Sequence, residues 1–583
     1  MNEFKDVYEV ITKEEEAYNL PIEPIAGWSW NMKKHIQVSA LYLNSQFEQD
    51  NENRTKRPNK NIIRPIINIQ KRTEGFDVKD IEIYIDNADE YYKSFLVQKY
   101  HDHWALENEM DTFIDEVVES YVDYGGVLVK KTKGLRPEVV NLQSLAFCDQ
   151  TNILSGTFGI KHFFSVPELR EMAGVWDKKQ MELVILKSRN EKQQDKDNIA
   201  SKTPGKYIEV YEVHGSFPDS WVDGDSDEYS SQIHVCTFYK DDNQNKHGVS
   251  LFRKREPKLP FKFLARDKIF GRALGMGGIE ELFEAQVWTN YAEKRMMEML
   301  DTASQILYKT TDQAFAKRNK MAELQNGEIL VLREGADIGQ IDTAPRNIAV
   351  FKDSEFGYAE HARQMGGASE VSLGDQPNAG TPFKSVEAQL FENNSLHKYR
   401  QGKIAVFMDE IYRDWLIPGF AKEITNGIKF LSELSIGEIQ DLAEKVSQSV
   451  ANNFAINQIL DGLDYNPEEV ALKKERAKQD FVAGGRKRFI EILKGELEDV
   501  PLKVVTNIAG KQKNLSAITD KMVNVIRQII ATPQIRQDPE LLKWVNGILE
   551  YSGLNTLGLS PAPAPEGSQS TEPLKELALP SPA

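Results

Sequence analysis

The most restrictive feature of the sequence is a loop-like segment followed by one very long helical pattern, at residues 366–418. The first part, GGASEVSLGDQPNAG, is small, polar and glycine-rich, so it cannot bury enough apolar surface to fold on itself. Thr381-Pro382 then supplies a capping side chain and a proline suited to the first helical position. Gly402 is the one helix breaker before Pro418. The helix would be roughly 50 Å long, which few domains need, and we expect it to be a spine behind a free loop.

Size, charge and cysteine content limit the class of protein. A chain of 583 residues is long enough for about two to four domains. The net charge of −17 argues against a protein that grips nucleic acid through a broad basic face, although nucleic acid could still pass along it. Cys148 and Cys236 are too few for a disulfide framework and indicate a reducing compartment. The acidic N-terminus lacks the apolar run of a signal peptide, and no apolar stretch approaches a membrane span.

Periodicity along the chain predicts a mainly helical α+β protein. Alternating apolar residues predict strands at 81–87, 127–131, 138–142, 206–215, 231–240 and 327–332. Apolar residues three and four apart predict helices at 28–50, 88–124 (one helix or two), 279–303, 351–365, 436–462, 466–494 and 511–550. The apolar segment around Pro65 fits either a helix kinked there or an edge strand. Composition predicts disorder at 189–206 and from residue 556 onward.

Two patterns resemble metal sites but fail on their details. The acidic loop at 219–228 alternates aspartates like a calcium loop, yet Glu228 and His234 stand where such a loop has glycine and glutamate. A solvated hairpin tip is the simpler interpretation. His101 and His103 lie two residues apart on a predicted helix, so they point to different faces, which argues against shared ligation.

No pattern indicates an enzyme. The glycines of GMGG (275–278) precede a helix like a phosphate loop, but no Lys-Ser/Thr follows. Glu280 and Glu281 would repel a phosphate from that helix N-terminus, so we interpret the glycines as a turn that needs a positive φ. A nucleophile elbow of the Gly-x-Ser-x-Gly type is absent from the sequence. A site assembled from distant loops stays possible without local support.

The order of the predicted elements resembles the portal protein of tailed bacteriophages, the head-tail connector ring at one capsid vertex. A glycine approach leads to the helix at 279–303, a mixed segment returns through the helix at 351–365, and the loop at 366–381 leads to the long helix. The segments that carry the resemblance are GRALGMGGIEELFEAQVWTNY, SLGDQPNAGTPFKSVEAQLFENN, NKNIIRPIINIQKR, VVESYVDYGGVLVKK and PEVVNLQSLAFCDQ. The resemblance covers most of residues 25–420 and is loose beyond Pro418.

The resemblance implies a portal-like α+β fold, with wing, stem, clip and crown regions around one very long helix. The implied regions are an N-terminal arm (1–24), the wing (25–278), a stem helix (279–303), the clip (304–350), a second stem helix (351–365), the tunnel loop (366–381), the long wing helix (382–416), a wing return (417–500), a helical crown (501–555) and a disordered tail (556–583).

The resemblance also implies where DNA and partners would touch the chain. The tunnel-loop residues expected at the DNA channel are Ser372, Leu373, Gly374, Asp375, Gln376, Pro377 and Asn378, with Lys384 nearby as the best candidate for a phosphate contact. The stem helix is net acidic, and its expected channel-lining residues are Glu284, Glu293 and Glu298. An acidic wall would let DNA slide, because strong phosphate contacts would act as a brake. The clip residues expected to dock the packaging motor or tail adaptor are Lys317, Arg318 and Lys320, for which a solvated turn is an equal alternative.

The two halves of the long helix differ in pattern. An apolar stripe in its C-terminal half predicts burial in the wing of its own subunit, and consists of Ile404, Met408, Ile411 and Trp415. The N-terminal half has Val386 and Leu390 followed by three polar positions, Asn393, Asn394 and His397. We expect that half to lean on a neighbouring subunit, close to the channel.

The implied function is a structural conduit for DNA packaging and ejection, without catalytic site, cofactor or metal. The expected partners are further copies of the chain in a ring of about twelve, double-stranded DNA in the channel, the major capsid protein, the terminase and tail adaptor proteins, with no membrane. The expected location is the portal vertex of a virion, after synthesis in the host cytoplasm. One alternative is another phage structural component, such as a tail adaptor or scaffold; the other is a nucleic-acid-processing enzyme.

Overall fold

The computed structural model describes most of the chain up to residue 506. The described residues are 3–45, 60–85, 91–194, 207–222, 228–240, 246–304, 307–311, 313, 317, 334–335, 337–341, 348–368, 383–425, 428–434, 436–460, 467–484, 487–492 and 502–506. Their contacts form two compact units. Unit 1 spans Met1–Ile428 and Ile492–Gly510, and unit 2 spans Lys429–Glu491 and Lys511–Ala583.

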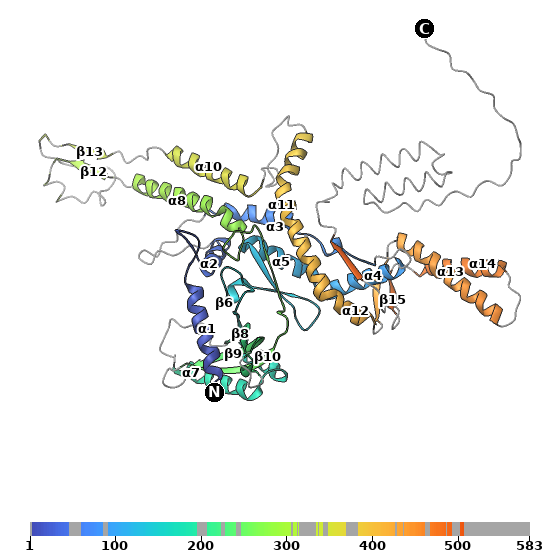
Figure 1. The fold of residues 1–583 in the computed structure, drawn as a ribbon. Helices are drawn as coiled ribbons and strands as arrows, with labels where there is room; N and C mark the ends of the chain where they lie inside the picture. The colour runs from blue at the N-terminus through green and yellow to red at the C-terminus, as the bar shows by residue number, and fades with distance from the viewer. Residues whose placement is uncertain are drawn as a thin grey trace, which may run out of the picture. The chain divides into compact units, whose positions relative to one another are not determined.

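Unit 1 contains most of the regular elements (Figure 1). Its helices are α1 (Glu3–Asn19), α2 (Met32–Leu43), α3 (Ile63–Glu74), α4 (Tyr91–Glu107), α5 (Met110–Tyr124), α6 (Val166–Glu171), α7 (Lys178–Gln194), α8 (Gly278–Ser304), α10 (Ile348–Met365), α11 (Phe383–Ile411) and α12 (Ile417–Thr425). Its strands are β1 (Ile22–Ile25), β2 (Trp28–Trp30), β3 (Ile81–Ile85), β4 (Gly126–Lys130), β5 (Glu138–Val140), β6 (Leu145–Phe147), β7 (Phe158–Ser165), β8 (Tyr207–Pro218), β9 (Tyr229–Lys240), β10 (Lys246–Arg255), β11 (Phe261–Ala265), β12 (Leu307–Thr310), β13 (Ile338–Ile341) and β16 (Leu502–Thr506).

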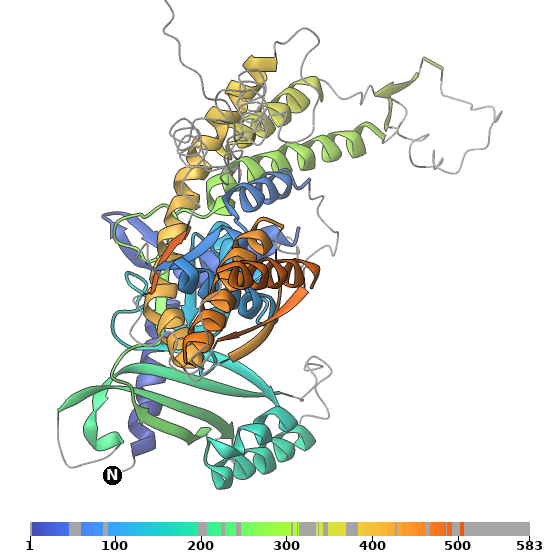
Figure 2. The ribbon, with the colours of Figure 1, turned by 90° about the vertical axis from the view of Figure 1, so that its right-hand side faces the viewer.

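The strands β10-β9-β8-β7-β6 form, in that order, a five-stranded antiparallel sheet (Figure 2). A hydrophobic cluster packs on each face of this sheet. Side chains alternate along a strand, so neighbouring residues of β8 belong to different clusters. Tyr211 and Val213 belong to the cluster that includes α1 residues. Ile208 and Val210 belong to the cluster that includes α7 residues. The sheet is therefore held between α1 and α7.

A three-stranded sheet, β11-β4-β5, connects this region to the helices that carry the candidate site. Helix α5 ends at Gly125, whose φ of 80° lets the chain turn directly into β4. The Gly125 carbonyl accepts backbone hydrogen bonds from Arg266 and Gly275 at 2.9 and 3.0 Å. A Cβ atom at Gly125 would lie only 2.4 Å from the Gly275 oxygen. Glycine is required here so that the 266–278 segment can approach α5.

Many of the predicted elements are confirmed. The strands expected at 81–87, 127–131, 138–142, 206–215 and 231–240 are β3, β4, β5, β8 and β9, and the helices expected at 279–303, 351–365 and 436–462 are α8, α10 and α13. The helical pattern at 88–124 forms two helices, separated at Glu109, which has a left-handed backbone with φ of 49°. Pro65 lies in the first turn of α3, where its missing N–H is tolerated, so no kink is needed.

The long helix does not end at Pro418, contrary to the prediction. Helix α11 runs into a π-helical turn at Tyr412–Leu416, and α12 follows directly. The backbone N–H of Ile417 bonds to the carbonyl of Tyr412, five residues back. A proline lacks an N–H and clashes with the carbonyl four residues before it. The π turn shifts the hydrogen-bond register ahead of Pro418, so the proline occupies the second position of α12 and the helical path continues.

Three further predictions are corrected by the structure. The segment expected to be disordered from residue 189 is helical as far as Gln194, at the end of α7. The helix expected at 466–494 ends at Ala483, and KRFIEI then forms strand β15 (Lys487–Ile492). Its alternation of apolar and charged residues suits a strand better than a helix. The region expected to be a helical crown begins with β16, which pairs with β3. Residues 195–206, 327–332, 511–550 and 556–583 lie outside the described residues.

Unit 2 is built from one strand pair and one helix pair. Strand β14 (Ile428–Glu433) pairs with β15, and α13 (Ile436–Leu460) packs against α14 (Pro467–Ala483). The Glu444 carboxylate of α13 binds Lys474 and Lys478 of α14 at 2.8 and 2.7 Å. None of the helices described in either unit has the length and apolar character needed to cross a membrane.

Candidate functional site

The candidate site is centred on a helical hairpin made by α8 and α10. The two helices pack side by side, and the antiparallel β12–β13 ribbon lies between them in the chain (Figure 1). Trp288 of α8 stacks on Tyr358 of α10, with ring centroids 6.4 Å apart and planes inclined by 18°. Lys60, which precedes α3, pairs with the buried Glu355 of α10. The hairpin is thus attached to the rest of unit 1 through both helices.

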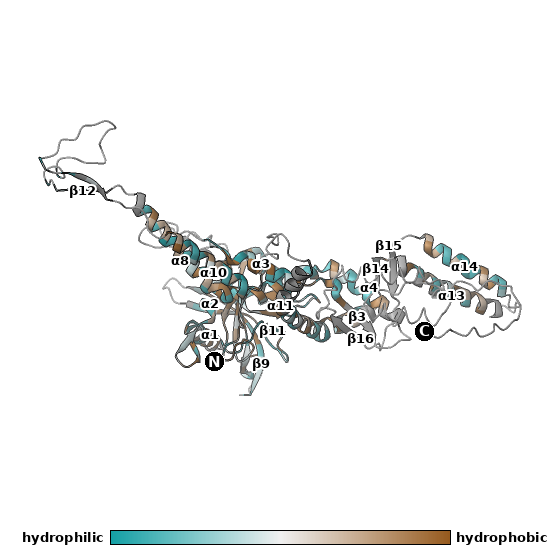
Figure 3. Ribbon diagram, turned by 90° about the horizontal axis from the view of Figure 1, so that it is seen from above, coloured by the Kyte–Doolittle hydropathy of each residue, from teal (hydrophilic) through white to brown (hydrophobic). Residues whose placement is uncertain are grey.

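One face of α8 collects exposed acidic and aromatic side chains. Residues spaced by four and three lie on one side of a helix, and this side carries Glu284, Trp288, Tyr291, Arg295 and Glu298. Glu298 binds both Lys294 and Arg295, at 3.7 and 3.6 Å. Hydrophobic and hydrophilic residues alternate visibly along α8 (Figure 3).

The three predicted channel residues do not share this face. Glu284 and Glu298 are both exposed on it, about four helical turns apart, with Trp288 between them. Glu293 lies five residues from Trp288, which places it about half a turn around the helix, where it is half-buried. The structure therefore places two of the three predicted residues on one face of α8.

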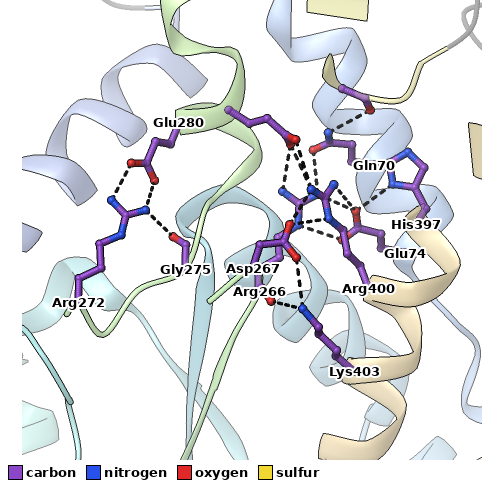
Figure 4. Close-up of polar contacts among 12 residues, drawn as sticks. Gln70, Glu74, Arg266, Asp267, Arg272, Gly275, Glu280, His397, Arg400 and Lys403 are labelled. Carbon is purple, nitrogen blue, oxygen red and sulfur yellow. Dashed lines mark hydrogen bonds and ion pairs between the residues drawn. The ribbon is translucent and has the colours of Figure 1, made fainter. Parts of the chain in front are cut away.

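The first turn of α8 is anchored by arginine. Arg272 makes a two-pronged ion pair with Glu280, with nitrogen–oxygen distances of 2.8 and 2.7 Å, and donates to the Gly275 carbonyl at 3.2 Å (Figure 4). Its guanidinium also lies 5.0 Å from the centre of the Trp30 ring. Glu280 is therefore committed to an ion pair that fixes this glycine segment. The prediction that the glycines need a positive φ is wrong, because none of Gly275, Gly277 and Gly278 has one. Glycine is needed at these positions because an added Cβ would lie less than 3.0 Å from neighbouring atoms.

A buried ion cluster joins α3, α8, α11 and the segment after β11 (Figure 4). Glu74 of α3 is fully buried and accepts from Arg266 at 2.6 Å and from His397 at 3.0 Å. Arg400 of α11 binds Asp267 at 2.6 Å and Glu281 of α8 at 3.3 Å. Buried charges are stable only when they are paired in this way. The cluster therefore fixes the start of α8 relative to the long helix.

Two further contacts close the cluster. Lys403 donates to the carbonyl of Arg266 at 2.7 Å and to the Asp267 carboxylate at 3.2 Å. Gln70 of α3 accepts from Arg266 at 3.3 Å and donates to the Gly366 carbonyl, at the end of α10, at 3.1 Å. Both ends of the α8–α10 hairpin therefore reach the same cluster.

The charge state of the cluster follows from these contacts. Burial alone would raise the pKa of Glu74, but the hydrogen bonds from His397 and Arg266 and the Arg400 charge outweigh burial and lower it. Burial likewise opposes ionisation of Asp267, and Arg400 and Lys403 lower its pKa. Both carboxylates are therefore held ionised, and the cluster carries opposite charges in contact.

The long helix contributes more to this cluster than its sequence pattern predicts. The predicted apolar stripe is confirmed, because Ile404, Met408, Ile411 and Trp415 are all buried. His397 was expected on a polar half that faces a neighbour, and that prediction is wrong: the side chain is fully buried against Glu74 of its own chain. A histidine fits either an exposed or a buried side of a helix, and its burial here depends on the ion pair with Glu74.

The tunnel-loop residues cannot be placed. Ser372, Leu373, Gly374, Asp375, Gln376, Pro377 and Asn378 lie outside the described residues, as do Arg318 and Lys320 of the predicted clip. Lys384 lies in the first turn of α11, and its side chain is outside the described part. Lys317 is exposed.

The structure describes part of the two sequence patterns that resemble metal sites. His101 is fully buried and bonds to the Tyr412 hydroxyl at 2.9 Å, whereas His103 is partly exposed and pairs with Glu107 at 3.3 Å. They do point to different sides of α4. Residues 223–227 of the acidic loop lie outside the described residues. Among the described side chains, no group of three or more histidine, cysteine, aspartate or glutamate residues is arranged to hold a metal ion.

A second buried polar cluster lies in the five-stranded sheet. Glu212 of β8 accepts from Lys130 at 2.5 Å, from His162 at 2.8 Å and from His214 at 3.1 Å. The other ring nitrogen of His214 lies 2.8 Å from Glu256. Burial would lower the pKa of His214, but its hydrogen bonds to Glu212 and Glu256 outweigh burial and raise it. With a carboxylate at each nitrogen, His214 is held as an imidazolium.

Sequence reasoning did not single out the ion cluster at Glu74, Arg266, Asp267 and Arg400. These residues come from three distant segments, so no local spacing connects them. A partial signal was present. Glu74 follows Ile67 and Gln70 on the buried side of α3, and Arg400 precedes Ile404 on the buried side of α11. A charged residue on an apolar stripe indicates a buried partner.

Comparisons with known proteins give little. No protein-family model matches the chain, and a search of curated proteins finds no relative. Among solved structures, the chain is similar to a chain from the neck of an empty gene transfer agent (GTA) particle, with a TM-score of 0.32 and 7% identity over 78% of this chain and 100% of that chain. It is also similar to a chain from the virion of a native GTA particle, with a TM-score of 0.31 and 9% identity over 78% of this chain and 99% of the other.

Proposed function

We propose that the chain is the subunit of a portal-like ring, a structural conduit for DNA at one vertex of a phage-like particle. The observation that carries this proposal is the hairpin of α8 and α10, which holds a small β ribbon and shares a buried ion cluster with the long helix α11. The order helix, ribbon, helix, loop, long helix is the order that the sequence resemblance implies. A hairpin fixed to a long helix by buried charges suits a rigid wall element better than a catalytic cleft.

The face of α8 that carries Glu284 and Glu298 is the part of the described wall that we assign to the channel. Glu284 and Glu298 are exposed on one side of α8, and Glu298 already has cationic partners on its own helix. A DNA phosphate therefore meets carboxylates or neutralised pairs on this face. Such a surface repels or ignores the backbone, which allows DNA to slide without being held.

The partners follow from this role. The β12–β13 ribbon and Lys317, between the two hairpin helices, are the part of the chain that we assign to the packaging terminase and tail adaptors. The loop at 366–381, between α10 and α11, is assigned to the DNA path. The capsid protein would contact the body of unit 1.

The direct test is the assembly state of the purified full-length chain. We expect electron microscopy and native mass spectrometry to show closed rings with a central hole and one defined copy number. A stable monomer under a range of salt and protein concentrations would contradict the proposal. A different closed symmetry without an axial hole of DNA width would favour a scaffold or adaptor role instead.

A second measurement separates the conduit from an enzyme. The ring should lack nuclease and ATPase activity above that of a mock purification. Robust activity that disappears when one carboxylate cluster is mutated would favour a nucleic-acid-processing enzyme over the conduit.

A further inference from the structure

The outer face of α11 is apolar although it lies opposite the buried stripe. Tyr399 and Val406 are 64% and 61% exposed, and Leu396 is 41% exposed. Together with Gly402 they follow spacings of three, three and four, which places them on one side of the helix. Lys403 lies beside this side, with its ammonium 4.5 Å from the centre of the Tyr399 ring. A helix that only faced water would carry polar residues at these positions.

The outer face of α10 has a matching composition. Val350 and Phe356 are 62% and 65% exposed. Asp353, Gly357 and Glu360 lie on the same side, away from the buried Glu355 and Ala362 that face the rest of unit 1. This face is apolar and small and carries the exposed Asp353, while Glu360 pairs with Arg363 of the same helix. The α11 face is also apolar and small and has the half-buried Lys398 at its edge, while Lys403 is bound to Asp267.

Each face contains a glycine that its own chain does not explain. A Cβ atom added to Gly357 or to Gly402 would meet nothing within 4 Å. Neither glycine has the left-handed backbone that would require it. Glycine inside a helix lowers helix stability relative to alanine. The missing side chain becomes useful when the backbone of another helix approaches closely at that point.

We propose that the outer face of α11 in one copy of this chain packs against the outer face of α10 in a second copy, with Gly402 and Gly357 near the point of closest approach. This inference rests on the proposed ring, since a closed ring needs two different surfaces on every subunit. The two faces meet that need: they lie on different helices, both expose large apolar side chains, and Asp353 on α10 and Lys398 on α11 carry opposite charges. Burial of Tyr399 and Phe356 provides the apolar centre, and the charges set the pairing of unlike faces.

Cross-linking between introduced cysteines tests the pairing in the full-length chain. The native Cys148 and Cys236 are both buried, so a bifunctional maleimide reacts selectively with new surface cysteines. We expect the double variant Val406→Cys with Phe356→Cys to give a ladder of covalent oligomers up to the ring size. Each single variant should stay uncross-linked, because the two unlike positions face each other only across the contact.

The outcomes separate this inference from the proposed function. Rings seen by native mass spectrometry without a ladder from the double variant contradict the α10–α11 pairing and leave the conduit standing. A covalent dimer from Val406→Cys alone shows a symmetric α11–α11 contact and overturns the inference. A chain that forms no ring contradicts both proposals.

The role of Gly402 can be tested by replacing it with a large side chain. Gly402→Trp should lower the ring fraction at least tenfold, while circular dichroism and the thermal unfolding midpoint of the chain stay close to wild type. Gly174→Trp is the matched control, because a Cβ there also meets nothing within 4 Å and the residue lies outside both faces. Equal ring fractions for the two tryptophan variants would refute the role of Gly402.

Discussion

Replacement of Glu74 by glutamine should destabilise unit 1 more than any surface ion-pair mutation. The carboxylate is fully buried and contacts Arg266 at 2.6 and 3.2 Å, His397 at 3.0 Å and Arg400 at 3.6 Å. Arg400 keeps Asp267 and Glu281 after the change, but Arg266 keeps only Gln70 and a carboxylate oxygen of Glu281 at 3.8 Å.

The magnitude follows from that loss of charge balance. Removing one partner of a buried ion pair costs about 3–5 kcal/mol, because the remaining charge stays out of water without full compensation. We expect a loss of this size in the free energy of unfolding measured with denaturant. Hydrogen exchange should become faster in α3, in the first turns of α8 and in α11, since these elements share the cluster.

The contribution of Glu74 to the free energy of unfolding should depend on pH. The pKa of Glu74 is lowered from 4.5 in the folded chain, so its contribution is present above pH 4.5 and is lost as the pH falls through the lower folded value. The stability difference between wild type and Glu74→Gln should therefore be constant from about pH 7 to pH 5 and shrink at lower pH.

The control is an exposed ion pair of similar geometry. Arg170 and Glu182 lie 3.0 Å apart, and both are about half exposed, so Glu182→Gln should leave stability unchanged within error. If Glu74→Gln and Glu182→Gln unfold at the same denaturant concentration, the cluster does not hold the hairpin to α11 as we infer.

Three further predictions test other parts of the chain. Gly275→Ala should cost about 1–3 kcal/mol in unfolding experiments, because its Cβ would lie 2.7 Å from the Asp267 carbonyl oxygen, whereas Gly174→Ala meets nothing and should be neutral. The pKa of His214 is raised in the folded chain, so its stabilising effect is complete below pH 6.5 and is lost as the pH rises through the folded value. His214→Asn should therefore remove this pH dependence of the unfolding free energy, measured by denaturant titrations at a series of pH values. An unchanged pH dependence would contradict the imidazolium assignment. Deleting Leu373–Gly380 should leave rings intact but reduce DNA packaging or retention, and failed ring assembly would show that the loop is structural. Lys384→Ala should reduce DNA retention alone, and normal retention would contradict the proposed phosphate contact.

Local patterns in the sequence predicted the elements whose stability is local. The sequence pattern of β8 predicted a strand because successive side chains of a strand point to opposite faces. In the structure each of these faces packs against its own apolar cluster. The stripe at Ile404 and Met408 predicted the buried side of α11 because the period of a helix repeats along the chain. In both cases the residues that decide the structure are near one another in sequence.

Features that depend on distant partners were not predictable in this way. The role of His397 was misjudged because Glu74, its partner, is 323 residues away. The continuation through Pro418 depends on a change of hydrogen-bond register one turn earlier, which leaves no compositional mark. The strand at 502–506 is short, and its pairing with β3 joins segments more than 400 residues apart in the chain.

The place of unit 2 in the chain has a consequence for how such a protein can vary. The described chain leaves unit 1 after Ile428 and re-enters it at Ile492, and the strands at these two points, β14 and β15, pair with each other. A segment whose ends are adjacent can be lengthened, shortened or exchanged with little strain on its host. Residues 434–486 are thus a natural segment to replace. A short turn that joins β14 directly to β15 should still allow β16 to pair with β3. A foreign domain inserted in place of residues 434–486 could be displayed on an otherwise complete subunit.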